Sequence, residues 1–268
     1  MVNRHIYIAF MKNNNIETKI LARKTNFDLH WDKNSSQKIP ANKKKTAEGF
    51  LEPLIEQLIS QHNYYVLDAG CGNGVHLEVL SKYKNTLLNN LFIGLDVSST
   101  ALKNIRLNNR LLVCGDMLNL PFSDNQFGAA ISYGALGYTD KPFRSFTELC
   151  RVLKVGGLLG VWMYPRRKGL LWVTFILIRR ICHFISPGLR RIIADCIVPF
   201  LSLLPTQSRV SLKNATWEQC REVVLINIEP NKLFFPTLGE LENWFNVNKI
   251  KIIYNDLRSP ITIWGIKQ

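Results

Sequence analysis

Alternating glycines follow a short apolar segment and predict a ligand-binding turn. Asp68 ends that segment, and Gly70, Gly72 and Gly74 come after it. Glycine has no Cβ, so its backbone can turn sharply and approach a ligand closely. The Asp68 carboxylate would attract a ligand ammonium and would repel a pyrophosphate. The turn therefore predicts a site for a cationic part of a small molecule.

Two further carboxylates stand where they could recognise a nucleoside. Asp96 ends the next apolar run, and a carboxylate at that place in dinucleotide folds accepts hydrogen bonds from both ribose hydroxyls. Asp116 and Met117 follow a third run. A carboxylate beside a flat apolar side chain can accept from an adenine amino group while the ring packs, although this pair could also be only loop and core.

Catalytic residues are less clearly marked. Tyr133 and Tyr138 follow the fourth apolar run, where ligands of open α/β sheets gather. We name them as candidates that line the side of the site that an acceptor substrate would approach, without acting as an obligatory base. Aromatic packing is an equally open explanation. The six cysteines show neither C-x-x-C spacing nor a His at zinc-ligand spacing, so we expect no metal site and no disulfide framework.

Apolar periodicity supplies the elements that would position these residues. It predicts strands at 64–67, 91–95, 111–113, 127–132, 158–163, 249–254 and 261–266, and helices at about 47–61, 75–83, 99–108 and 237–246. Another helix should open at Asp140 with Pro142, bury Phe143 and Leu153, and end at Gly156. Strands that alternate with helices indicate parallel βαβ units. We predict an α/β fold, a doubly wound Rossmann-like sheet of seven mainly parallel strands with an inserted helical lid.

Four motifs in order make the chain similar to the class I S-adenosylmethionine-dependent methyltransferases, especially the ubiquinone and menaquinone branch. They are Val66–Gly74, Gly94–Ser98, Cys114–Met117 and Glu148–Gly157, all within residues 47–164. The resemblance implies S-adenosyl-L-methionine as cofactor, with Asp68, Gly70, Gly72 and Gly74 on the methionine part, Asp96 on the ribose, and Asp116 with Met117 on the adenine. Gly128 and Val155 depart from the family pattern, and neither should contact the cofactor.

The resemblance implies methyl transfer to a small, lipid-like or amphipathic acceptor. An NAD-dependent oxidoreductase is one alternative, which Asp68 and the G-x-G-x-G spacing disfavour. A non-catalytic S-adenosylmethionine-binding or membrane-adaptor protein is another. Nucleic acid is not the expected acceptor, because residues 132–136 lack the Asn/Asp-Pro-Pro-aromatic run that the resemblance associates with methylation of base amino groups.

Composition and charge divide the chain. With 47% apolar and 20% charged residues it is typical of a folded protein rather than a disordered one. The net charge is +14, yet residues 47–164 hold 9 basic and 10 acidic residues, so the excess lies in the flanks. We expect a basic N-terminal extension over 1–46 and a methyltransferase domain over 47–268, with a helical insertion at about 165–235.

The insertion combines bulky apolar residues with seven cations and has no carboxylate before Asp195. One interpretation is an inserted pair of helices that packs on the main domain. The other is a lid whose residues 165–205 cover the acceptor and contact an anionic membrane, with Pro187–Gly188 breaking it into two short helices that lie on the surface. No apolar run approaches the roughly 20 residues of a spanning helix, so we expect a cytoplasmic protein with at most peripheral membrane contact.

Overall fold

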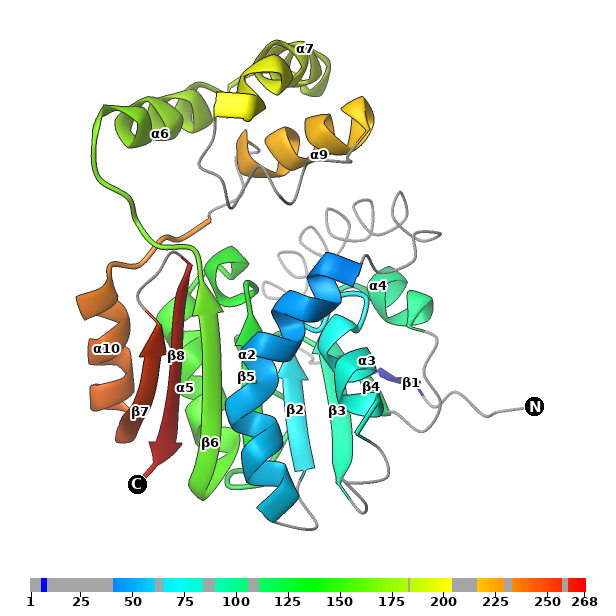
Figure 1. The fold of residues 1–268 in the computed structure, drawn as a ribbon, viewed down its shortest axis with the longest axis vertical. Helices are drawn as coiled ribbons and strands as arrows, with labels where there is room; N and C mark the ends of the chain where they lie inside the picture. The colour runs from blue at the N-terminus through cyan, green and yellow to red at the C-terminus, as the bar shows by residue number, and fades with distance from the viewer. Residues whose placement is uncertain are drawn as a thin grey trace, which may run out of the picture. The chain divides into compact units, whose positions relative to one another are not determined.

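The computed structural model describes residues 6–8, 41–60, 65–83, 90–105, 111–182, 184–203, 216–228, 233–256 and 260–268. The chain falls into two compact units, Met1–Pro165 with Phe234–Gln268, and Arg166–Leu233 (Figure 1). The first unit contains the sheet, and the second is helical. The predicted limits, 1–46 and 47–268 with an insertion at about 165–235, stay predictions.

A mainly parallel sheet forms the centre of the first unit. Its strands are β1 (Ile6–Ile8), β2 (Tyr65–Ala69), β3 (Leu91–Asp96), β4 (Leu111–Cys114), β5 (Phe127–Tyr133), β6 (Leu153–Met163), β7 (Ile250–Asp256) and β8 (Ile261–Lys267). Their order is β1-β4-β3-β2-β5-β6-β8-β7, and β8 runs antiparallel to both of its neighbours. All seven predicted strands are present, so the predicted doubly wound α/β fold is confirmed. β1 adds an eighth strand that pairs parallel with β4 at one edge.

The topology brings the candidate residues to one edge of the sheet. The chain runs outward from β2 through β3 to β4, then returns to the other side of β2 with β5 and β6. Ligands of open α/β sheets bind at the carboxyl ends of the strands where the order reverses. Asp68, Asp96, Asp116 and Tyr133 lie at or just after the carboxyl ends of β2, β3, β4 and β5.

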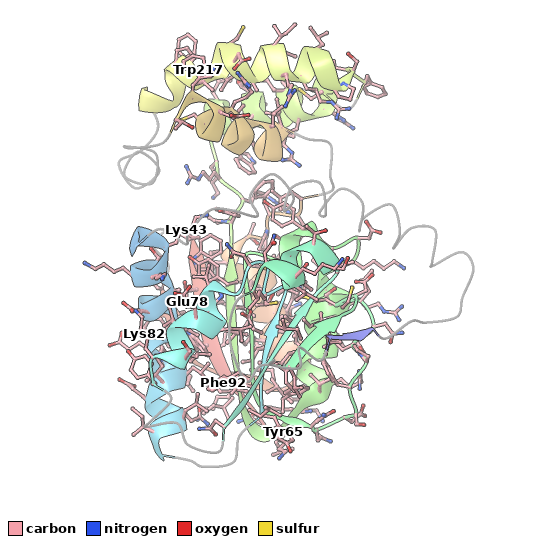
Figure 2. The ribbon with its side chains drawn as sticks, turned by 90° about the vertical axis from the view of Figure 1, so that its right-hand side faces the viewer. Lys43, Tyr65, Glu78, Lys82, Phe92 and Trp217 are labelled. Carbon is pink, nitrogen blue, oxygen red and sulfur yellow. The ribbon has the colours of Figure 1, made fainter. Side chains whose placement is uncertain are left out.

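Helices cover both faces of the sheet. On one face α2 (Ala41–Ser60), α3 (Val75–Ser81) and α4 (Ser99–Asn104) bury leucines against Val66 and Phe92. On the other face α5 (Pro142–Val152) and α10 (Leu238–Val247) bury Phe146, Trp244 and Phe245. Two ion pairs, Lys44 with Glu78 and Glu48 with Lys82, join α2 to α3, and Figure 2 labels Glu78 and Lys82 on the side of α3 next to α2.

Several predicted boundaries differ from the observed ends of the helices and strands. α2 begins six residues before the predicted start at 47. α4 ends at Asn104, where Ile105 turns to an extended conformation with φ −74° and ψ 114°, and the rest of the predicted helix, 106–108, lies outside the described residues. α5 ends at Val152, because Leu153 pairs with Phe127 and begins β6 well before residue 158. Phe143, predicted on the apolar face of α5, is 42% exposed.

The second unit is a small helical cluster. It contains α6 (Leu170–Cys182), α7 (Pro187–Ile197), a 3-10 segment η2 (Val198–Leu203) and α9 (Trp217–Ile228). The predicted break into two helices is confirmed, since Ser186 caps α7 and Pro187 occupies its first turn. The cluster has its own apolar core, formed by Cys182, Ala194, Val198, Val224, Leu225 and Ile228. None of the helices within the described ranges is both long and apolar enough to cross a membrane.

Gly160 of β6 provides a test of the sheet packing. A Cβ at this position would overlap the ring of the fully buried Trp264 on β8. We expect Gly160→Ala to lower the free energy of unfolding by about 1–3 kcal/mol, because overpacked cores must shift side chains or backbone. Urea unfolding measures the change.

Gly49 on α2 offers the matched control, because a Cβ there meets nothing within 4 Å. Gly49→Ala should be neutral or stabilise by up to about 1 kcal/mol, as alanine is the better helix former. Equal effects of the two substitutions would contradict the packing described for β6 and β8.

Candidate functional site

The turn after β2 is a glycine loop in a conformation that other residues rarely adopt. Gly70, Gly72 and Gly74 have φ angles of 78°, 53° and 79°. A Cβ on Gly70 would also overlap the Cβ of Ala135, so contact as well as conformation excludes a side chain there. α3 begins directly after Gly74. The predicted turn is present, and its geometry requires glycine.

The end of β3 holds this loop in place. The Leu95 carbonyl accepts hydrogen bonds from the amides of Gly70 and Cys71 at 2.7 and 3.0 Å. Asp96 is buried, and its Oδ2 accepts from the Gly72 amide at 2.8 Å while Oδ1 accepts from the amide two residues further along at 2.9 Å. Asp96 therefore holds the glycine loop to the end of β3, and its contact with ribose hydroxyls stays a prediction. Sequence reasoning predicted the second role and missed the first.

Asp68 is a buried carboxylate that makes no hydrogen bond within the described part of the chain. It is 1% exposed, and neither of its side-chain oxygens has a hydrogen-bond partner. Nδ1 of His76 lies 3.6 Å from Oδ2, beyond hydrogen-bond distance, and Nε2 of His76 is also buried without a partner. Burying a polar group without hydrogen bonds is costly, and a ligand ammonium in contact with Asp68 would remove that cost. The site therefore fits the cationic group that the glycine turn predicted.

Asp116 and Met117 lie on the turn after β4. Oδ1 of Asp116 accepts from the Leu118 amide at 2.9 Å, so this partly buried carboxylate shapes its own turn. Met117 is 7% exposed, and its Sδ lies 3.9 Å from Oγ of Ser132. Its Cε lies 3.5 Å from the place of a Cβ on Gly70. The structure brings Met117 beside the glycine loop, and a contact with adenine stays a prediction for both residues.

Tyr133 belongs to an aromatic cluster next to Asp68. Its ring stacks on Trp162 with centroids 4.2 Å apart and planes 16° apart. The ring of His76 lies 4.8 Å away and that of Phe50 lies 5.0 Å away. Burial raises the pKa of the Tyr133 hydroxyl, which disfavours the phenolate. This environment suits a positioning side chain better than a base.

Tyr138, the other tyrosine candidate, lies partly buried on the 3-10 turn η1 (Leu136–Tyr138). Sequence reasoning gave no role to Phe50, His76 or Trp162. His76 carried one usable signal, because it stands two positions after Gly74 in the first turn of α3. Phe50 and Trp162 come from α2 and β6, and only the folded chain brings them together.

Basic side chains of α5 hold the segment 118–124, which follows the turn after β4. Arg151 donates from Nη2 to the Leu120 carbonyl at 3.1 Å and from Nη1 to the Phe122 carbonyl at 2.9 Å. Arg144 donates to the first carbonyl of the segment at 3.1 Å. The segment therefore has its backbone fixed by one helix face.

Glu148 completes this arrangement. It forms two hydrogen bonds of 2.9 Å with Arg151 and accepts from the Leu120 amide at 2.9 Å. Desolvation raises the pKa of the Glu148 carboxyl, but the bonds from Arg151 and Leu120 outweigh it, so that the pKa is lowered. The sequence motif at 148–157 thus positions the segment that continues from Asp116.

Metal-ligating side chains and cysteine thiols are the remaining groups that could carry chemistry. Within the described ranges, no three His, Cys, Asp or Glu side chains gather in a way that could hold a metal ion. None of the six cysteines forms a disulfide bond. Burial, with smaller contributions from Asp68 and Asp96, raises the pKa of Cys71 in the glycine loop, so the thiolate is disfavoured there.

Comparison with known sequences identifies relatives of the central part of the chain. A family model described as a methyltransferase domain matches residues 67–161. Demethylmenaquinone methyltransferase of Corynebacterium kroppenstedtii is 43% identical over 36% of this chain and 40% of its own length. 24-Methylenesterol C-methyltransferase 2 of Arabidopsis thaliana is 28% identical over 46% of this chain and 36% of its own. The chain thus matches less than half the length of these relatives.

Comparison with solved structures agrees on the fold. The YcgJ protein of Bacillus subtilis superposes with a TM-score of 0.52 at 14% identity, over 82% of this chain and 99% of that one. A chain of the complex between the Haloferax volcanii Trm112 methyltransferase activator and a methyltransferase gives 0.51 at 14% identity, over 90% and 96%. At such low identity the likeness concerns the fold alone.

The anchoring of segment 118–124 generates a prediction for Arg151. We expect Arg151→Ala to lower the free energy of unfolding by about 2–3 kcal/mol, because Glu148 and two carbonyls lose charged partners. Arg151→Lys should not restore stability, since one ammonium cannot reproduce the planar set of donors. Urea unfolding of each variant provides the measurement.

Arg144→Ala is the matched control, because Arg144 makes one exposed bond to the same segment. Its effect should stay below about 1 kcal/mol. If Arg151→Ala were no more destabilising than Arg144→Ala, the anchoring role would be wrong.

Proposed function

We propose that this protein transfers a methyl group from S-adenosylmethionine to a small, lipid-like acceptor. The proposal starts from the class I S-adenosylmethionine-dependent methyltransferase domain that residues 67–161 form. The observation that carries the proposal is the buried Asp68 carboxylate beside the glycine loop, whose oxygens accept no hydrogen bond from any described residue. An ammonium of the methionine part would give it a charged partner. A pyrophosphate at the same place would be repelled, which disfavours an NAD-dependent oxidoreductase.

Each candidate residue is proposed to contact one part of the cofactor. Asp68 with Gly70, Gly72 and Gly74 would hold the methionine part, Asp96 the ribose, and Asp116 with Met117 the adenine. Support comes from Asp96, which already binds the loop through the Gly72 amide, and from Met117, which lies against the same loop. The residues proposed for the methionine, ribose and adenine parts are therefore neighbours on one sheet edge.

Transfer itself demands positioning more than proton chemistry. The sulfonium of S-adenosylmethionine supplies an activated methyl group with a good leaving group. The residues of the site have to align the acceptor nucleophile with that methyl and exclude water. The partly buried Tyr133, which packs against Trp162 and His76, would form part of the wall, and its raised pKa argues against service as a base. Tyr138 is the second candidate on this side.

A lipid-like acceptor is supported by the names of two relatives and by the charge of the central part of the chain. The names of two relatives state a quinone precursor and a sterol as their substrates. Another relative is named a tRNA methyltransferase, but residues 47–164 of this chain carry 9 basic and 10 acidic residues and so offer no excess charge for a phosphate backbone. Peripheral contact with an anionic membrane through residues 165–205 would bring the enzyme to such an acceptor.

Asp68→Asn tests the ammonium site. We expect the affinity for S-adenosylmethionine to fall by about 3 kcal/mol, more than a hundredfold in Kd, because a buried charge loses its partner. Affinity for 5′-methylthioadenosine, which has no ammonium, should change less than about threefold. Without ligand the variant should unfold at higher urea, since a buried amide costs less than a buried carboxylate.

Isothermal calorimetry with both ligands gives the comparison. An equal loss for the two ligands would show a general defect of the loop and contradict the assignment of Asp68.

Asp96→Ala tests the ribose site. We expect binding of S-adenosylmethionine to weaken by about 2–3 kcal/mol, because hydrogen bonds to a charged acceptor are the stronger kind. Glu56→Ala, which removes an exposed carboxylate from α2, should leave the affinity unchanged. Unchanged affinity in Asp96→Ala, or tighter binding of NAD than of S-adenosylmethionine by the wild type, would refute the proposal.

A further inference from the structure

The second unit exposes apolar residues along one face of α6. Leu170, Val173, Leu177 and Ile181 are spaced three or four positions apart, so they follow one face of this helix, and Phe184 lies on the turn just after it. Each is at least 52% exposed, and Leu170 and Phe184 reach 81% and 85%. Single exposed leucines are ordinary, whereas a continuous exposed stripe indicates an interaction surface.

A similar stripe runs along α7 into η2. Leu189, Ile192 and Phe200 are 47%, 60% and 63% exposed, and Cys196 between them is exposed as well. α6 and α7 both turn their other faces toward α9, where Cys182 and Ala194 share the apolar core with Leu225. The two outward stripes therefore face away from α9, which Figure 2 marks by Trp217.

The charge around these stripes has a single sign. Between Arg166 and Ala194 the sequence holds seven Lys and Arg residues and no Asp or Glu. Arg180 on α6 and Arg191 on α7 are exposed. The next carboxylate, Asp195, accepts from Arg221 at 2.6 Å and from Trp217 at 2.7 Å, both on α9. The outward side of the unit thus combines bulky apolar side chains with cations, which is typical of helices that lie in a lipid interface.

We propose that the outward faces of α6 and α7 dock on an anionic phospholipid bilayer. Charge complementarity identifies the occupant, because basic residues near an anionic leaflet add to the insertion of apolar side chains. α6 has 13 residues, about 20 Å of helix against a hydrocarbon core of about 30 Å, and its place is the plane of the interface. The purpose of docking, delivery of a lipid-like acceptor, rests on the proposed function, whereas docking itself requires neither cofactor nor acceptor.

The structure separates the cations that can be tested from those that hold the unit together. Arg190 donates to the Cys182 carbonyl at 2.9 Å, and Arg179 lies 5.7 Å from the centre of the Phe175 ring. Substituting either would disturb the helices as well as the charge. Arg180 and Arg191 are exposed, so substituting them changes mainly the charge, and they are the appropriate choice.

Co-sedimentation of the full chain with vesicles provides the test. We expect binding to vesicles of phosphatidylcholine mixed with phosphatidylglycerol, weakened by high salt, and little binding to phosphatidylcholine alone. Arg180→Gln combined with Arg191→Gln should lower the partition coefficient roughly thirtyfold. Leu177→Ser combined with Ile181→Ser should weaken it further by removing inserted side chains.

Matched controls come from the first unit. Lys141→Gln with Lys251→Gln removes two exposed cations, and Val247→Ser removes an apolar side chain that is 62% exposed. These variants should bind vesicles as the wild type does. Circular dichroism of every variant verifies that the helices are retained.

Two results would overturn the proposal. One is a wild-type protein that stays in the supernatant with anionic vesicles at low salt. The other is self-association that Leu177→Ser with Ile181→Ser abolishes while vesicles bind nothing, which would assign the stripes to a second copy of the chain. Cofactor binding is measured separately, so loss of docking with intact binding of S-adenosylmethionine refutes the surface alone, and the reverse result refutes the proposed function alone.

Discussion

Hydrogen bonds from the glycine loop to the end of β3 are the contact on which the candidate site depends. β2 and β3 pair in a register that sets Asp68 opposite Gly94 and Ala69 opposite Leu95, which brings the Leu95 carbonyl under the loop amides. Gly94 keeps the two strands and α3 in close contact, since a Cβ there would lie 2.8 Å from the Leu77 side chain. A one-residue change of register would turn every side chain of β3 to the other face. The sheet pairing, the loop conformation and the direction of Asp96 are therefore one coupled arrangement.

The buried Asp68 makes this arrangement costly in the absence of a ligand. Nδ1 of His76 lies 3.6 Å from its Oδ2, and the His76 ring packs against those of Phe50 and Tyr133, yet within the described residues the Asp68 oxygens receive no hydrogen bond. α2 contributes Phe50 to this aromatic cluster, and its ion pairs with α3 help to keep it there. Sites of this kind are often less stable than the rest of a fold, because recognition of a charged group requires polar atoms that the protein itself leaves unsatisfied.

Local patterns predicted the strands and the glycine loop, but not the contacts that only tertiary structure creates. Buried parallel strands are continuous apolar runs, so the five parallel strands β2 to β6 were recognisable. Leu153 continued the apolar face expected of α5, and its pairing with Phe127 placed it in β6 instead. Trp162 belongs to a residue type that cores commonly contain, and no spacing marks its stacking on Tyr133. Local patterns did not predict the hydrogen bonds from Arg151 to segment 118–124 either, because these bonds join residues about 30 positions apart.

The short strand β1 has a consequence for the order of folding. Ile6 pairs with Leu112, so more than a hundred residues of chain separate two strands that contribute only three paired positions. Closing so long a loop costs entropy before any contact repays it, and three positions repay little. We therefore expect β1 to join the sheet only after β2, β3 and β4 have assembled. Until then the outer side of β4 is an open template with free backbone donors and acceptors, the kind of edge at which nascent chains aggregate.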